Sequence, residues 1–188
     1  TYNVSDAAGN AATQVTRTVN VTGDETNPVI TLTGDVTVTI EVGTDYTDAG
    51  ATAIDNSDGD LTSSIVTVST VNTAIIGSYT VTYNVSDTAG NAATQVTRTV
   101  NVVDTTVPVI TLSGDATVTI WVGAVYTDAG ATATDNYDGD ITNNITIVNS
   151  VDTSVVGSYT VTYNVSDAAE NPATQVTRTV NVTADVTS

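Results

Sequence analysis

The chain has 188 residues, 40% of them hydrophobic, and its 21 acidic residues against three arginines give a formal net charge of −18. Such a chain offers no basic surface to the phosphates of nucleic acid, and anionic membrane surfaces are disfavoured for the same reason. It contains no Cys, His or Lys, which excludes disulfides, isopeptide bonds from lysine and the usual catalytic bases and nucleophiles. We therefore expect no enzyme activity, and the lack of a long apolar run predicts no direct membrane insertion.

Three parts of the chain have nearly the same sequence. Residues 1–21 match the later part of two longer segments, Gly77–Val102 and Gly157–Val182. Apolar residues fill alternate positions there, which is the pattern of a half-buried β-strand: Tyr79, Val81, Tyr83 and Val85. A turn-forming stretch, Ser86–Asn91, then precedes a second strand. Each copy is a predicted β-hairpin, which cannot bury its apolar face alone. We expect residues 1–21 to close a repeat whose earlier strands lie outside this sequence.

A polar linker, Gly23–Pro28, leads into the first of two full repeats, which run Pro28–Val102 and Pro108–Val182. Their first prolines lie 80 residues apart, a spacing that suits a small sandwich domain rather than a solenoid repeat. The predicted domains are a closing hairpin at 1–22 and full repeats at 23–103 and 104–183. Residues 184–188 are predicted to start a further linker.

The first full repeat shows turn signals roughly every 8 to 12 residues, the spacing of a sandwich of short strands. We expect strands at 29–33, 36–42, 51–55 and 65–71 before the closing hairpin, with turns at 43–50 and 72–77 and an acidic loop at 56–60. Alternation in the second strand predicts four inward residues: Val36, Val38, Ile40 and Val42. Together these patterns predict an all-β chain of tandem immunoglobulin-like β-sandwich domains, with about seven strands each.

Four stretches of the first repeat resemble the bacterial surface Ig-like repeat family, which is related to hyalin-type repeats: PVITLTGD, VGTDYTDAGATAIDNSDGD, GSYTVTYNVSDTAGN and TRTVNV. The resemblance covers essentially the whole chain. It implies a β-sandwich, an extracellular or bacterial cell-surface location and a structural or adhesive role in large adhesins and exoproteins. It identifies no ligand.

Several loops of each repeat are rich in acidic and amide residues. In a sandwich with this strand order we expect these loops to lie at one end of the repeat, the end next to the preceding domain. Linker residues Asp24 and Glu25 are expected near this end. Crowded carboxylates repel one another, and a hard cation with roughly six to eight oxygen ligands relieves the repulsion. We therefore predict calcium at two sets of residues: Asp55, Asn56, Asp58, Asp60, Asp87 and Asn91 in the first repeat, and Asp104, Asp135, Asn136, Asp138, Asp140 and Asp167 in the second. The alternative is that these residues only cap and solvate turns.

The three arginines occupy one equivalent position of the hairpin: Arg17, Arg98 and Arg178. Arg98 shares its parity with the apolar residues Val96 and Val100. Either a bulge turns the guanidinium outward, or it lies at the edge of the core and pairs with an acid.

The second full repeat carries Trp121, Val125 and Tyr137 where the first has Glu41, Asp45 and Ser57. Trp121 falls on the outward parity of its strand. Apolar rings on a surface of Thr and Asp are where a partner gains most from burial, so we predict a lateral or interdomain contact there. The alternative is that the ring packs under a neighbouring loop.

These observations predict a structural repeat segment of an extracellular bacterial protein. It would act as a spacer, stalk or filament shaft, with calcium stiffening the domain junctions. Its predicted partners are neighbouring Ig-like repeats of the same chain, with homotypic fibre or lateral contacts. Two alternatives remain open: an adhesive module that binds glycan or protein through its loops, and a fibre subunit that assembles through edge or donated strands.

Overall fold

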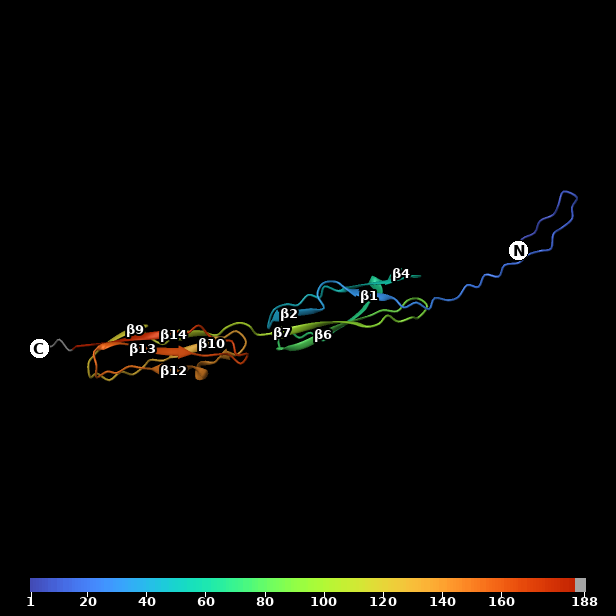
Figure 1. Cartoon of the computed structure of the whole chain (residues 1–188). Helices are drawn as coiled ribbons and strands as arrows, with labels where there is room; N and C mark the ends of the chain where they lie inside the picture. Colours follow the sequence, from blue (N-terminus) through green and yellow to red (C-terminus); the bar gives the residue numbers. More distant parts are fainter. Residues whose placement is uncertain (185–188) are drawn as a thin grey trace. The chain divides into compact units, whose positions relative to one another are not determined.

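A computed structural model describes residues 1–184, and the regular secondary structure in them is almost entirely β-strand (Figure 1). Residues 1–21 form a bridged hairpin, with Tyr2 opposite Val15 and Ser5 opposite Ala11. Its apolar side chains are exposed; Tyr2 is 60% and Val4 is 68% accessible. None of the helices in the described residues is long and apolar enough to cross a membrane.

Each full repeat contains seven strands arranged in two sheets. In the first repeat the strands are β1 (Val29–Leu32), β2 (Thr37–Glu41), β3 (Ala51–Asp55), β4 (Gly59–Asp60), β5 (Val66–Ser69), β6 (Gly77–Asn84) and β7 (Val96–Val103), with a 3-10 turn, η1, at Thr62–Ser64. The strand orders are β1-β3-β4 and β2-β7-β6-β5. Strand β2 runs parallel to β7, and β1 runs antiparallel to β3.

The second repeat has the same elements in the same order. They are β8 (Val109–Leu112), β9 (Thr117–Trp121), β10 (Ala131–Asp135), β11 (Gly139–Asp140), η2 (Thr142–Asn144), β12 (Thr146–Asn149), β13 (Gly157–Asn164) and β14 (Val176–Thr183). The sheets are β11-β10-β8 and β12-β13-β14-β9. The predicted all-β, Ig-like fold with seven strands per repeat is confirmed.

The core of the second repeat joins its two sheets. In the second repeat Ile110 and Ala133 come from one sheet, and Val161, Tyr163 and Val180 come from the other. Along β13 burial alternates in the order predicted from the sequence, and β6 shows the same burial pattern in the first repeat. Burying a Val or Ile side chain contributes about 1.5 to 3 kcal/mol, so the Val-rich alternation is what closes each sandwich.

The structure corrects three details of the predicted strands. Val36 is 61% exposed and lies before β2, because the chain bends at Gly34, with φ 79°, and again at Val36 itself. The predicted acidic loop 56–60 includes the short strand β4, which pairs with the end of β3. Strand β5 is shorter than the predicted 65–71, and the 3-10 turn that precedes it was not predicted.

The described chain also divides by its internal contacts into two compact units. One consists of residues 1–36, 49–68 and 81–98, and the other of residues 37–48, 69–80 and those from Thr99 onward. The boundary crosses β6 and β7 of the first repeat and does not follow the linkers. The domain limits at 22/23, 103/104 and 183/184 therefore stay predictions, and residues 185–188 of the expected last linker lie outside the described residues.

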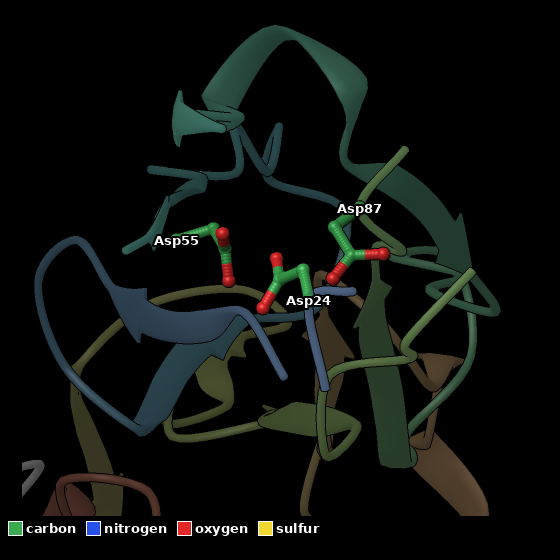
Figure 2. Close-up of side chains that lie close together, drawn as sticks. All are labelled: Asp24, Asp55 and Asp87. Atoms are coloured by element: carbon green, nitrogen blue, oxygen red, sulfur yellow. The ribbon is translucent and has the colours of Figure 1, made fainter. Parts of the chain in front are cut away.

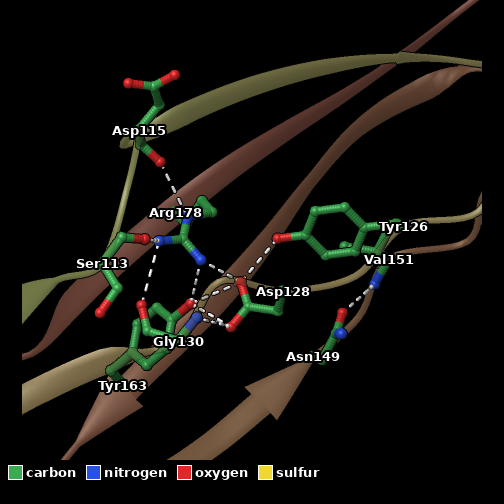
Figure 3. Close-up of polar contacts among 9 residues, drawn as sticks. All are labelled: Ser113, Asp115, Tyr126, Asp128, Gly130, Asn149, Val151, Tyr163 and Arg178. Carbon is green, nitrogen blue, oxygen red and sulfur yellow. Dashed lines mark hydrogen bonds and ion pairs between the residues drawn. The ribbon is translucent and has the colours of Figure 1, made fainter.

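Arg178 lies inside the second repeat and links a carboxylate to three backbone carbonyls (Figure 3). Its guanidinium pairs with Asp128, and it donates hydrogen bonds to the carbonyls of Ser113, Asp115 and Gly130. The Tyr163 hydroxyl accepts from Arg178 at 2.9 Å and donates to Asp128 at 2.6 Å. Arg98 is buried to the same extent, at 1% exposed, so the outward interpretation is wrong for both of these arginines. Pairing with an acid is confirmed for Arg178, whereas Arg17 in the first hairpin is exposed.

Asp128 stays ionised within this core. Burial alone would raise the pKa of its carboxyl, but hydrogen bonds from Tyr163, Tyr126 and Arg178 outweigh that effect and lower it. Burial and the neighbouring Asp128 raise the pKa of Tyr163, which keeps the hydroxyl protonated as a donor. The group is therefore a paired charge surrounded by donors, the condition under which a buried ion pair is tolerated.

Candidate functional site

Three segments of the first repeat bring carboxylates together. Asp24 comes from the linker before β1, Asp55 ends β3, and Asp87 lies in the turn after β6. One carboxylate oxygen of each lies within 4.8 Å of the others. Figure 2 shows Asp24 between Asp55 and Asp87, with their carboxylates facing one another. These three side chains are the first acidic cluster.

The turn between β3 and β4 positions Asp55. Its Oδ1 accepts hydrogen bonds from the backbone N–H groups of Ser57 at 2.8 Å and Asp58 at 3.0 Å, as in an Asx turn. Gly59 completes the turn at φ 75°, a conformation that glycine adopts without strain. Oδ1 is thereby used by the turn, while Oδ2 of this 4%-exposed residue is buried and has no hydrogen-bond partner. Leaving a buried acceptor unpaired costs about 1 to 3 kcal/mol.

Asn91 holds both the Asp87 side chain and the linker that contains Asp24. Its backbone N–H and its side-chain amide each donate to the Asp87 carboxylate at 2.7 Å, and the same amide donates to the backbone carbonyl of Asp24 at 3.1 Å. Asp58 joins the two loops, because its carboxylate accepts from the N–H and the hydroxyl of Thr88 at 2.7 and 2.9 Å. The loops and the linker are thus held together by side-chain hydrogen bonds.

The second acidic cluster is formed by Asp104, Asp135 and Asp138, again with one oxygen of each within 4.8 Å of the others. Asn171 donates to the backbone carbonyl of Asp104 at 3.1 Å, as Asn91 does to that of Asp24. Burial raises the pKa of the Asp104 carboxyl, and the negative charges of Asp135 and Asp167 raise it further. The site therefore concentrates negative charge at a side chain that is only 6% exposed.

The other residues that were predicted to bind calcium lie outside the two acidic clusters. Asp60 and Asp140 are exposed and accept from the backbone N–H groups of Thr62 and Thr142, the first residues of the 3-10 turns, at 2.9 and 3.0 Å. Asn56, Asn136 and Glu25 are exposed, and Asp167 is held by Asn171. The structure thus gathers Asp55 and Asp87 with Asp24, and Asp135 and Asp138 with Asp104. Their binding of a metal stays a prediction.

The linker between the two full repeats, residues 104–106, is also contacted by Glu41 at the end of β2, and this contact was not predicted from the sequence. Its carboxylate accepts from the backbone N–H groups and the hydroxyls of Thr105 and Thr106; both hydroxyl contacts are 2.7 Å. Hydrogen bonds from the hydroxyls of Thr105 and Thr106 lower the pKa of Glu41 to about 2. The partners lie 64 and 65 residues apart from Glu41 in sequence, and no local pattern indicates the contact.

Replacing Glu41 with alanine is expected to free this linker. A hydrogen bond to a charged group contributes about 1.5 kcal/mol or more, so the amide protons of Thr105 and Thr106 should exchange at least about tenfold faster. Hydrogen exchange followed by NMR measures this directly. Glu25→Ala, which removes an exposed glutamate from the other linker, is the matched control, and equal exchange in both variants would contradict the assigned contact.

The predicted contact residues of the second repeat are exposed. Trp121, which replaces Glu41, is 54% accessible, Val125 is 91% accessible and Tyr137 is 40% accessible. Trp121 is the last residue of β9, which is an edge strand of its sheet. A partner for these side chains stays a prediction.

Comparison with known proteins gives matches to both repeats. Residues 30–102 and 110–182 each match the family model of the bacterial surface protein Ig-like domain. The chain is similar to hyalin of Strongylocentrotus purpuratus, at 32% identity over 193 residues, covering 96% of this chain and 16% of hyalin.

Among solved structures, the chain is similar to a lipoprotein from Bacteroides thetaiotaomicron, at 27% identity and a TM-score of 0.38, over 43% of this chain and 40% of that one. It is also similar to a structure of the CBM51-2 domain, in complex with GlcNAc, and INT domains of ZmpB from Clostridium perfringens. That match has 29% identity and a TM-score of 0.34, over 42% of this chain and 17% of that one.

Proposed function

The chain belongs to the family of bacterial surface protein Ig-like domains, and we propose that it serves as a spacer, stalk or filament-shaft segment of an extracellular protein. The observation that carries the proposal is the repetition itself. Two successive segments form the same seven strands, with identical burial along the hairpin strands β6 and β13 and along β7 and β14. A chain that builds the same small sandwich twice gains reach with each copy, which is what a spacer needs.

In this proposal the linkers limit bending. Glu41 holds Thr105 and Thr106 on one side, and Asn171 holds the carbonyl of Asp104 on the other, so the segment 104–106 is anchored at both ends. Calcium at the acidic clusters would add to this stiffness. The net charge of −18 would keep neighbouring chains apart in dilute salt.

We propose no catalysis for this segment. The family is a surface Ig-like domain family rather than an enzyme family, and the sequence lacks the His, Cys and Lys side chains on which most acid–base and nucleophilic mechanisms depend.

An adhesive module is the second candidate, and the exposed Trp121 favours it. A third, self-assembly into a fibre, draws support from the edge strands β5 and β12, where Val66, Val68, Ile147 and Val148 are each about half exposed or more. In all three candidates the chain lies outside the cell or at its surface, and the adjacent repeats of the same chain are its partners.

A glycan screen on the immobilised chain separates a spacer from an adhesive module. A spacer is expected to give no saturable signal with any glycan. Saturable binding that Trp121→Ala removes, while Tyr2→Ala in the exposed hairpin leaves it unchanged, would overturn the spacer role and establish the second repeat as an adhesin.

A further inference from the structure

We propose that each acidic cluster binds one calcium ion, which joins the linker preceding a repeat to the loops of that repeat. This goes beyond the spacer role, because cation binding does not depend on what the chain does in its host. The first site is formed by Asp24, Asp55 and Asp87, and the second by Asp104, Asp135 and Asp138.

The hydrogen-bond pattern supports this inference independently of the clustering. Four aspartates each use Oδ1 to hold their own turn: Asp24 and Asp104 accept from the N–H groups of Thr26 and Thr106, and Asp55 and Asp135 accept from the N–H groups that follow them. In all four the other oxygen, Oδ2, is buried with no hydrogen-bond partner. Asp55 is 4% exposed and Asp104 is 6% exposed, so water has little access to these oxygens.

An unpaired anionic oxygen at so buried a position requires a positive partner. The chain has only three cationic side chains, all arginines, and the two in the full repeats are placed elsewhere: Arg98 donates to the carbonyl of Asp35 and to Tyr83, and Arg178 to Asp128. Repetition of the same unpaired oxygen at equivalent positions of both repeats indicates a shared ligand. A cation held by three carboxylates meets this requirement.

The donors identify the class of cation. Every side-chain donor in the two clusters is a carboxylate oxygen, and the sequence contains no His or Cys, so the softer transition metals have none of their preferred ligands. Hard cations remain. Magnesium requires a near-octahedral shell and keeps several waters, whereas calcium accepts six to eight oxygens in irregular arrangements, including bidentate carboxylates. Three carboxylates that converge from a linker and two loops in the first cluster, and from a linker and one loop in the second, suit calcium better.

Isothermal titration of the whole chain with calcium chloride, after removal of metals with EDTA, tests the proposal. We expect two equivalents bound. Extracellular calcium modules have dissociation constants of about 0.1 to 1 mM, so 10 mM calcium should raise the ratio of folded to unfolded protein roughly 10- to 100-fold per site. Thermal unfolding with and without calcium measures that increase. No heat of binding and an unchanged transition at 10 mM calcium would overturn the proposal, and equal binding of magnesium would overturn the assignment of calcium.

Matched variants locate the sites. Asp55→Asn is expected to reduce the stoichiometry from two to one, and Asp55→Asn with Asp135→Asn to none. Asp60→Asn and Asp140→Asn, which change exposed aspartates close to the same loops, should leave two. Because a variant of a buried residue can fail to fold, Asp24→Asn in the linker provides a second test of the first site, with circular dichroism to confirm the fold. Loss of calcium in the Asp60→Asn and Asp140→Asn variants equal to that in the cluster variants would contradict the assigned ligands.

Discussion

Replacing Arg178 with alanine is expected to lower the free energy of unfolding of the second repeat by about 3 kcal/mol. The substitution leaves Asp128 as an unpaired charge that is only 14% exposed and removes the donor from the carbonyls of Ser113, Asp115 and Gly130. Breaking a buried ion pair by removing one partner costs about 3 to 5 kcal/mol, and the residual exposure of Asp128 places this case at the lower end. Urea unfolding followed by circular dichroism measures the change.

The chain contains its own control for this substitution. Arg17 occupies the equivalent position in the exposed hairpin, so Arg17→Ala should change the free energy of unfolding by less than about 0.5 kcal/mol. A second readout follows the carboxylate itself: without the guanidinium, the pKa of Asp128 should rise from its lowered value, as an NMR titration would detect. A loss of stability below about 1 kcal/mol would show that the ion pair contributes little beyond its desolvation cost.

Replacing Tyr163 with alanine is expected to cost about 3 to 5 kcal/mol, the usual range for removing a buried aromatic ring. Tyr163 is fully buried on β13 and packs with Ile110, Ala133 and Val180 from both sheets, so its loss leaves a cavity at the centre of the sandwich. Thermal or urea unfolding of the second repeat measures the effect.

Two variants separate the ring from its hydroxyl. Tyr163→Phe keeps the ring and should cost about 1 to 2 kcal/mol, because it removes only the hydrogen bonds to Arg178 and Asp128. Tyr2→Ala changes the equivalent residue of the hairpin, which is 60% exposed, and should be close to neutral. If Tyr163→Phe costs as much as Tyr163→Ala, the hydrogen bonds rather than the packing hold this part of the core.

Local alternation was sufficient to predict the hairpin strands and the class of fold. Val81, Tyr83 and Val85 are buried in the order that the sequence predicts, because a strand with one buried face must alternate. The same rule was wrong for Val36, since the bend after Gly34 delays the start of β2. Alternation along the strand also could not predict whether the side chains of Arg98 and Arg178 point inward or outward. Their direction depends on backbone carbonyls that lie 48 to 65 residues away in sequence.

The acidic clusters were partly predictable. The acidic loop that follows Asp55 and the hairpin turn that contains Asp87 were expected to lie near the linker, and Asp55, Asp87 and Asp24 do meet. Composition could not separate Asp55 from Asp60, which lie five residues apart on either side of one turn. The Asp55 side chain is buried at the end of β3, whereas the exposed Asp60 accepts from the N–H of Thr62. The roles of Asp128 and Glu41 were missed for a related reason. Glu41 lies in the predicted strand 36–42, Asp128 lies in the second repeat's counterpart of the predicted turn 43–50, and their partners come from distant parts of the chain.

Stretching a single molecule between its ends tests most directly whether the chain is a series of equal, independent sandwiches. Each matched segment, 30–102 or 110–182, contains 73 residues. At about 3.6 Å per extended residue its unfolding should release roughly 20 to 26 nm, after allowance for the length of the folded repeat. The account predicts two successive events of equal length in this range. A single event of about 50 nm, or two of clearly unequal length, would contradict it.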